Sequence, residues 1–242
     1  MTAPQPAPAF EPIAQMRAHE YVAEQIRRQI GLRLIPSGGS LPSERDLAVL
    51  FGVGRATVQQ AVRLLEAERL VESRRGRHGG TFVIAPTSDD LAMDYLLLRL
   101  RRDAGRVKEA LVYRRHIEPV AAGLAATTRR KAELSEIEAA CGRAESAESD
   151  IAFMTHDTQF HLAVARTGRN RFIVESVERL RLVLNDALTA LPESELWHER
   201  SRREHAPILE AIGTRDGEAA RAAMTQHVSS TERSINALLA AL

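Results

Sequence analysis

Apolar residues in the first third of the chain follow a helical spacing and then change to a strand-like spacing. Val22, Ile26 and Ile30 are four residues apart, which places them on one face of a helix. Two further helical segments follow, separated by a turn that contains Gly52 and Gly54, and two short β-rich runs come after them. The elements predicted here are helices at 15–30, 44–51 and 55–67 and strands at 70–73 and 81–84.

The rest of the chain, from residue 89, has helical spacing and no convincing strand. Residues such as Gly105, Gly168 and Pro192 divide it into segments. Successive antiparallel helices with short connections are typical of a bundle. The predicted helices span 90–101, 106–127, 131–147, 150–166, 170–190, 195–212 and 216–241.

Two of the N-terminal helices have the pattern of a helix-turn-helix. Ser43 is a good N-cap for the first helix, and Asp46 three residues later makes a near capping box. The second helix carries polar residues at its start, where this motif meets the major groove of DNA. The side chains that it would present to the groove are Arg55, Thr57 and Gln59.

A basic hairpin directly follows the helix-turn-helix, in the run Arg74-Arg75-Gly76-Arg77-His78-Gly79-Gly80. Its glycines permit a close approach, and its arginines suit phosphates or a minor groove. An isolated arginine cluster is more often a solvated loop. The position after a helix-turn-helix favours DNA contact instead, as the wing of a winged helix.

The predicted fold class is therefore mainly α, with an N-terminal winged helix-turn-helix and a C-terminal all-helical antiparallel bundle. The first ten residues are rich in Pro and Ala and carry no charged side chain, which predicts a disordered tail. The predicted organisation is a tail at 1–10, a DNA-binding domain at 11–86, a linker at 87–92 and the bundle at 93–242.

Charge and cysteine content narrow the possible partners and compartment. The 242-residue chain has a net charge of +1, but residues 11–86 carry eleven Arg against eight acidic residues. The basic excess is thus in the predicted DNA-binding domain. The single cysteine, Cys141, excludes an intramolecular disulfide and indicates a reducing cytosol. No apolar run reaches ~18 residues, so we expect a cytoplasmic protein without a membrane partner.

Four residues of the predicted bundle form a candidate metal site. Asp157 and His161 are four residues apart on one helix and so share a face, while His205 and His227 lie on two later helices. One carboxylate and three imidazoles suit a divalent metal such as Zn, Ni, Mn or Fe. Any single histidine is more often a surface residue, and the residues alone leave the two interpretations balanced. His156 points about 100° away from Asp157 on the helix and is left out.

The front segment resembles the N-terminal domain of the GntR family of bacterial transcription regulators. The resemblance implies that Arg45, Arg55 and Thr57 contact the operator, with Arg75 and Gly76 at the wing. The chain departs from the family at Gln59-Gln60, where Arg-Glu is frequent, and glutamine prefers adenine edges whereas arginine prefers guanine. The matching residues are Leu41-Pro42-Ser43-Glu44-Arg45, Arg55-Ala56-Thr57-Val58, Leu64-Leu65-Glu66-Ala67-Glu68 and Gly79-Gly80-Thr81-Phe82-Val83.

The bundle resembles the FCD ligand-binding domain that often follows this winged helix. The resemblance implies that Asp157, His161, His205 and His227 hold the metal, with Zn as the first choice. The matching motifs are Asp157-Thr158-Gln159-Phe160-His161, Gly168-Arg169-Asn170, Glu204-His205-Ala206-Pro207-Ile208 and Met224-Thr225-Gln226-His227.

Arg114 and Glu118 occur at family-like spacing and allow two interpretations. As residues i and i+4 they could form a surface ion pair worth ~0.3–0.5 kcal/mol. We favour the alternative that the resemblance implies, in which both belong to the effector site and Arg114 binds an effector carboxylate in a bidentate fork. Asn170 is better explained as a helix N-cap than as a ligand contact.

The sequence therefore predicts a metabolite-responsive transcription regulator, in most such cases a repressor, that is not an enzyme. It would bind double-stranded operator DNA as a homodimer, with a small organic acid at the metal site. One alternative is a metal-dependent hydrolase or lyase with an accessory DNA-binding domain, in which Glu118 would serve as the base. The other is a metal-sensing regulator, in which the ion itself is the signal.

Overall fold

The computed structural model describes residues 16–76, 79–84, 90–147, 149–191 and 194–242. The predicted tail at 1–10 lies outside these ranges. Within them the chain is mainly helical, which confirms the predicted fold class. The elements are α1 (Ala18–Gly31), α2 (Glu44–Phe51), α3 (Arg55–Ala67), β1 (Val71–Arg74), β2 (Gly80–Val83), α4 (Asp90–Arg102), α5 (Ala104–Thr128), α6 (Lys131–Glu145), α7 (Asp150–Thr167), α8 (Arg171–Thr189), α9 (Ser194–Thr214) and α10 (Gly217–Ala241).

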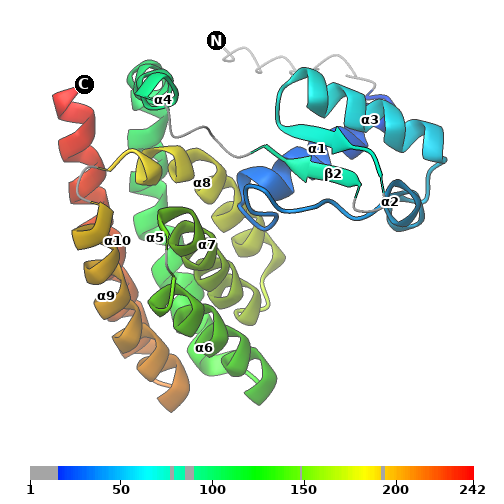
Figure 1. Ribbon diagram of the computed structural model, residues 1–242. Helices are drawn as coiled ribbons and strands as arrows, with labels where there is room; N and C mark the ends of the chain where they lie inside the picture. The colour runs from blue at the N-terminus through cyan, green and yellow to red at the C-terminus, as the bar shows by residue number, and fades with distance from the viewer. Residues whose placement is uncertain (1–15, 77–78, 85–89, 148, 192–193) are drawn as a thin grey trace, which may run out of the picture.

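The N-terminal part is a three-helix unit with a two-stranded wing (Figure 1). Ser43 caps α2 by accepting a hydrogen bond from the backbone N–H of Asp46, as its sequence position predicts. Gly52 ends α2 with a φ of 64°, a left-handed conformation that glycine adopts without strain. One core holds the unit together, built from Val22, Ile26, Leu47, Val58, Val62, Leu65, Val71 and Val83 among others.

The two wing strands are antiparallel, and their register pairs Val71 with Val83 and Arg74 with Gly80. Each strand therefore lies one residue away from its predicted position. The register has a physical reason: Val71 and Val83 are the buried ends of the two strands, so their pairing closes the core below the wing.

The C-terminal part is a bundle in which α5 runs through the centre and packs against α7, α8, α9 and α10. Its Ala-rich second half allows this close packing, because Ala122, Ala125 and Ala126 are fully buried against Ile208 and Val228. At α8, Asn170 caps the helix by accepting from two backbone N–H groups, which confirms the predicted N-cap. No helix among the described residues is both long and apolar enough to cross a membrane.

The winged helix lies beside α8 and contacts the bundle through the end of α1 (Figure 1). The chain is already helical at Asp90, within the predicted linker of 87–92. Residues 85–89 of the connection lie outside the described ranges. The two parts are thus joined both by the chain and by a noncovalent contact at α8.

Candidate metal centre and DNA-binding surface

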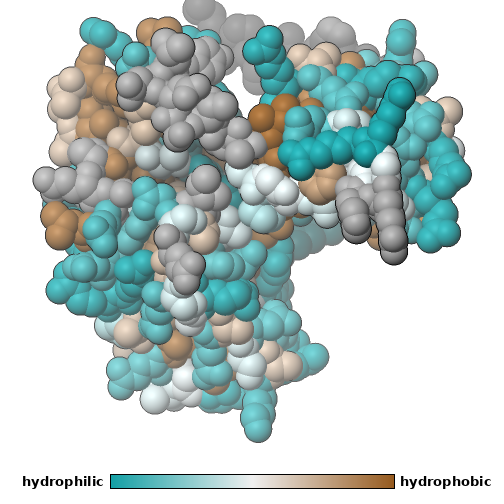
Figure 2. All heavy atoms as spheres, in the orientation of Figure 1, coloured by the Kyte–Doolittle hydropathy of each residue, from teal (hydrophilic) through white to brown (hydrophobic). Residues whose placement is uncertain are grey.

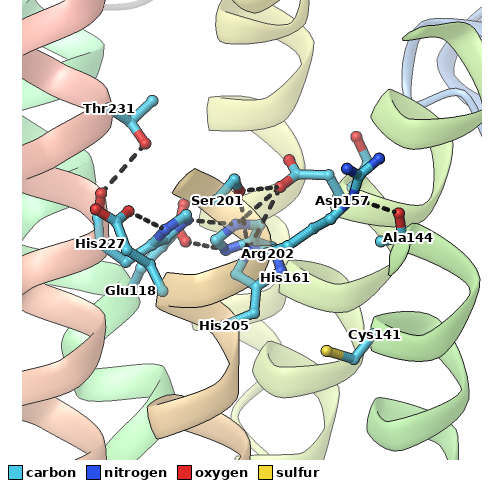
Figure 3. Close-up of polar contacts among 12 residues, drawn as sticks. Glu118, Cys141, Ala144, Asp157, His161, Ser201, Arg202, His205, His227 and Thr231 are labelled. Atoms are coloured by element: carbon cyan, nitrogen blue, oxygen red, sulfur yellow. Dashed lines mark hydrogen bonds and ion pairs between the residues drawn. The ribbon is translucent and has the colours of Figure 1, made fainter. Parts of the chain in front are cut away.

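The four predicted ligand residues meet in the middle of the bundle, although they come from three helices. Asp157 and His161 lie on α7, His205 on α9 and His227 on α10, and all four are at most 2% exposed. One potential ligand atom from each lies within 4.8 Å of the others. The close-up shows the side chains pointing toward one another from facing helices (Figure 3).

The donor atoms that face each other are the three Nε2 atoms and one carboxylate oxygen. His161 Nε2 lies 3.2 Å from His227 Nε2. Asp157 Oδ1 lies 3.5 Å from His205 Nε2 and 3.9 Å from His161 Nε2. Ligands at about 2.1 Å from one ion are about 3.0–3.4 Å apart in octahedral or tetrahedral geometry. The donors therefore fit a divalent transition metal with little rearrangement.

Two carboxylates orient two of the imidazoles by contacting Nδ1, the ring nitrogen that does not face the centre. Glu118 Oε2 lies 2.5 Å from His161 Nδ1, and Glu204 Oε2 lies 3.1 Å from His227 Nδ1. A carboxylate at Nδ1 favours the tautomer that carries the proton there and leaves Nε2 free as a ligand. The structure thus supplies for two histidines the outer partner that metal-binding histidines usually have.

The other two ligand residues are held by an arginine and by an aromatic ring. Arg181 donates to Asp157 Oδ2 at 2.5 Å, which leaves Oδ1 to face the imidazoles. Phe160 stacks on His205 with ring centroids 4.1 Å apart and fixes the plane of that ring. Ser201 contacts both Asp157 Oδ1, at 3.3 Å, and His205 Nε2, at 3.5 Å. All four ligand side chains therefore have defined orientations.

Arg114 and Glu118 are buried beside this group, at 1% and 2% exposure, so the surface ion-pair interpretation is wrong. Arg114 donates to Glu118 at 2.7 Å, and its Nη2 lies 3.4 Å from His161 Nε2. Its Nη1 has no hydrogen-bond partner among the described residues. A buried guanidinium with an unused donor next to a candidate metal site is suited to an anionic ligand.

The surroundings of the two buried carboxyls of the centre favour their ionised form. Burial alone would raise the pKa of Glu118, but Arg114 and then His161 outweigh it and hold that pKa well below its usual value. Burial likewise opposes ionisation of Asp157, but Arg181 and the surrounding imidazoles hold its pKa well below its usual value. With neutral imidazoles, two arginines and two carboxylates balance to a formal charge of zero.

Burial favours the neutral form of two of the imidazoles. Burial lowers the pKa of His205 well below its usual value, and the neighbouring His227 lowers it further. Burial and then His161 do the same to the pKa of His227. Neutral imidazoles are the form that binds metal. His198, outside the group, stacks on Phe153, and burial lowers its pKa as well.

Sequence reasoning missed Arg181, Ser201 and Glu204. Ser201 is four residues before His205, so it shares a helix face with its partner. Arg181 and Glu204 are more than twenty residues from their partners Asp157 and His227, so no helical spacing connects them. In the sequence, Glu204 is only the neighbour of His205. His156 is correctly absent from the group, because its Nδ1 faces Gln159 Oε1 at 3.2 Å.

Two of the six predicted DNA-contacting residues line a groove between the helix-turn-helix and the wing. The groove is a hollow of about 580 Å³, and both Arg45 and Arg55 line it. Arg45, Arg55 and Gln59 are exposed, whereas Thr57 is half-buried. Hydrophilic side chains cover most of the visible face of this domain (Figure 2). The remaining lining residues are Ser40, Leu41, Pro42, Ser43, Glu44, Ser73, Arg74, Gly79, Gly80 and Thr81.

Two of these predictions gain detail from the structure. Gln59 Nε2 donates to Glu44 Oε2 at 2.9 Å. To contact a base, the Gln59 amide must either break this hydrogen bond or keep it and contact the base with its remaining polar atoms. Arg75 and Gly76 are exposed at the tip of the wing, and Gly76 has a φ of 110° that favours glycine. Residues 77–78 of the predicted basic hairpin lie outside the described ranges.

A winged helix joined to a ligand-binding helical bundle defines a class of transcription regulators. A family model for bacterial regulatory proteins of the gntR family matches residues 18–83, and a model for the FCD domain matches residues 109–230. The chain belongs to the GntR family and carries an FCD effector-binding domain. The family is one of transcription regulators and not of enzymes, so the hydrolase or lyase alternative has no support.

Curated relatives resemble the chain over most of its length. The Uxu operon regulator of Haemophilus influenzae is 28% identical, with 89% of this chain and 81% of the relative covered. The putative L-lactate dehydrogenase operon regulatory protein of Escherichia coli K12 is 28% identical over 88% and 84%. The transcriptional repressor NanR of Klebsiella aerogenes is 28% identical over 94% and 88%.

Solved structures share the fold at low sequence identity. A putative GntR transcriptional regulator from Rhodococcus sp. RHA1 has a TM-score of 0.50 and 22% identity, with 90% of this chain and 97% of that chain covered. The E. coli protein McbR/YncC has a TM-score of 0.50 and 15% identity over 92% and 99%. These likenesses support the architecture of winged helix and bundle.

We expect the chelator-treated protein to lose stability as the pH falls from 7 to 5. The pKa values of His205 and His227 are lowered in the folded state, so below about pH 6.5 the unfolded chain binds protons that the folded chain does not. Two such groups reduce the free energy of unfolding by up to about 2.7 kcal/mol per pH unit. Urea denaturation across this range measures the slope.

The control is the double variant His205→Gln/His227→Gln, which lacks both of these groups. Its slope should be clearly shallower than that of the wild type. Equal slopes in the two proteins would show that His205 and His227 are not buried in their neutral form. Asp157 and Glu118 do not contribute in this window, because they are ionised in both states above about pH 5.

Proposed function

We propose that this protein is a homodimeric repressor whose winged helices bind a pseudo-palindromic operator and whose bundle binds a metal ion and a small carboxylate effector. The observation that carries the proposal is the buried group of Asp157, His161, His205 and His227 with the unused Arg114 Nη1 beside it. Binding of the effector would relieve repression. This holds only if the effector binds one arrangement of the dimer better than another.

The charge of the centre favours an anionic effector. Arg114 and Arg181 balance Asp157 and Glu118, so a divalent ion adds positive charge to the buried centre, which Glu204 at His227 offsets only in part. Excess charge at a buried position is costly, and a carboxylate from the effector offsets part of it. Arg114 supplies a second contact for the same head group. One relative is named for an L-lactate dehydrogenase operon, and lactate is a small hydroxy acid of this class.

Zinc is the first choice for the metal. Three imidazole nitrogens and one carboxylate oxygen at these spacings suit its usual coordination. Nickel, manganese and iron accept the same donors, and their octahedral geometry leaves two positions for the effector. When bound, the metal would supply a positive centre that recognises the carboxylate.

A second copy of the chain would account for two features. Regulators with a helix-turn-helix commonly read two half-sites of an operator as a dimer. Large apolar side chains on α5 and α8 are also open to solvent, with Val112 48%, Tyr113 47% and Phe172 65% exposed. Tyr113 Oη and Ser176 Oγ, 3.0 Å apart, join the two helices at this face. Such a face is suited to a dimer contact.

The operator surface is tested by Arg45→Ala and Arg55→Ala. Each change should reduce affinity for a selected operator by 10-fold or more, because one side chain at the start of each helix of the motif is removed. Selection from random duplexes supplies the operator, and fluorescence anisotropy measures affinity. Arg101→Ala, an equal charge loss on exposed α4, should change affinity less than threefold. Comparable losses in all three variants would indicate only nonspecific charge attraction.

The bases read by this surface are tested at Gln59 and the wing. Gln59→Arg should shift the selected consensus from adenine toward guanine at one position of each half-site. Arg75→Ala should instead weaken binding to all sequences alike and flatten the salt dependence, as expected for a phosphate contact. An unchanged consensus for Gln59→Arg would mean that this side chain does not read bases.

The metal is tested by elemental analysis of purified protein. We expect about one ion per subunit, lost in His205→Ala and in His227→Ala because each removes one of four ligands. Asp157→Asn should lower affinity without abolishing binding. His156→Ala is the matched control, since this histidine adjoins Asp157 but faces elsewhere. Absence of an ion in the wild type, with no uptake of added zinc, would contradict the proposal.

The effector is tested by calorimetric titration with hydroxy-, keto- and sugar acids, with and without zinc. A small carboxylate should bind only to the zinc-loaded protein, and Arg114→Ala should remove most of that affinity. Arg115→Ala, the next residue on the exposed face of α5, should have no effect. The best binder should shift operator affinity by roughly 5- to 150-fold. If zinc shifted operator affinity and no acid changed it further, the protein would be a metal sensor.

A further inference from the structure

One face of α8 is the docking surface for the winged helix. Glu178, Leu182, Asn185 and Thr189 follow each other at spacings of four, three and four residues, so they form one stripe along the helix. Every member of the stripe approaches the end of α1 or the loop behind it. The docking contacts are Arg28 with Glu178, Gly31 with Leu182, Gly31 with Asn185, and Arg33 with Thr189.

The docking is close and has an apolar anchor. A Cβ at Gly31 would lie 2.8 Å from Leu182 Cδ2, so a larger residue at this position would require the Leu182 side chain to shift. Leu34, three residues later, packs into the bundle cluster that contains Leu162 and Val177. The winged helix therefore has a defined contact surface on α8.

One of these contacts continues into the metal centre. Asn185 Nδ2 donates to the backbone oxygen of Gly31 at 3.0 Å, and its Oδ1 accepts from Thr158 Oγ1 at 3.4 Å. Thr158 Oγ1 in turn accepts from Arg181 at 2.8 Å, and the same Arg181 nitrogen donates to Asp157 Oδ2 at 2.5 Å. An unbroken path thus runs from a candidate metal ligand to the last residue of α1.

The path is buried and has a fixed direction. Asp157, Thr158, Arg181 and Asn185 are all at most 2% exposed, so water does not compete for their hydrogen bonds. Arginine can only donate, so Thr158 Oγ1 accepts from Arg181. The Thr158 hydroxyl then donates its hydrogen bond to Asn185 Oδ1. The amide nitrogen of Asn185 is then the atom that meets Gly31, because the reversed amide would place two oxygens together.

We propose that Asn185, with Thr158 and Arg181, is the coupling element that transmits the state of the metal centre to the DNA-binding domain. The inference rests on the proposed function, since it requires both the metal and the operator. Asp157 divides its carboxylate between the imidazole-facing Oδ1 and the Arg181-bound Oδ2. A cation held at Oδ1 would draw charge from Oδ2 and weaken its hold on Arg181, and a shift of Arg181 would reach Gly31 through Thr158 and Asn185.

The joint has room for the movement that this coupling requires. A cavity of about 300 Å³ lies between the two domains, and Gly31, Arg33, Asn185 and Asp186 are among its lining residues. The Arg28–Glu178 contact lies outside the path. The other arginine near Glu178 is Arg166, which does not belong to the metal centre. Glu178 is therefore a matched control that docks the domain without reaching the metal.

The experiment compares the operator affinity of full-length zinc-loaded protein with that of chelator-stripped protein. The wild-type ratio should be roughly 5- to 150-fold. Thr158→Val cuts the path within the bundle, and Asn185→Ala cuts it at the joint. Both variants should keep about one zinc per subunit but bring the ratio below about twofold. Thr158→Ser restores the hydroxyl and should restore the ratio, which also separates coupling from a folding defect.

A readout without DNA accompanies this measurement. Zinc should change hydrogen exchange of amides at residues 28–36 in the wild type and in Thr158→Ser, but not in Thr158→Val. Glu178→Ala should keep the wild-type ratio in the affinity measurement.

Four outcomes would overturn the relay. The first is an operator-affinity ratio of one in wild-type protein that binds zinc, and the second is a wild-type affinity ratio in both Thr158→Val and Asn185→Ala. The third is an affinity ratio that Thr158→Ser does not restore, and the fourth is a loss of the affinity ratio in Glu178→Ala equal to that in the path variants. A protein that bound no zinc, or that selected no operator, would instead contradict the proposed function, and metal analysis or selection would reveal this separately.

Discussion

The structure depends on a charge-balanced polar cluster in the core of a helix bundle. Two arginines, two carboxylates and three imidazoles lie where water does not reach, and each ionised group removed from water costs several kcal/mol. The cost is offset because Arg114 pairs with Glu118 and Arg181 with Asp157. The Arg181–Asp157 pair joins α8 to α7, whereas Arg114 and Glu118 lie on the same helix, α5, and contact α7 through His161.

This balance also explains why the cluster is suited to bind something. A fully satisfied buried network would be a static core, but Arg114, Arg181 and His205 each retain nitrogen atoms without a hydrogen-bond partner among the described residues. Native proteins seldom leave such groups unpaired. Of these groups, the Arg114 guanidinium lies beside the candidate ligand atoms, with its Nη2 3.4 Å from His161 Nε2. An unused donor on this guanidinium suits the anionic ligand of the proposed function.

Periodicity and local spacing could predict much of this arrangement, because these features depend on neighbours in sequence. The helices, the Ser43 and Asn170 caps and the shared face of Asp157 and His161 are of this kind. The outer partners Arg181 and Glu204 could not be found in this way, since they meet the centre only after distant helices pack. For the same reason the spacing of Arg114 and Glu118 did not show whether the pair was exposed or buried.

The same limit applies to α8, whose sequence resembles an ordinary amphipathic helix. Its inner face supplies Arg181 to the centre, and its outer stripe seats the winged helix at Gly31. Asn185 lies one turn from Arg181 and contacts both sides. In the proposed relay, a shift of the Arg181 side chain reaches the α1 contact at Gly31 through Thr158 and Asn185. A bundle can therefore influence a distant DNA-binding surface without a large rearrangement of its own core.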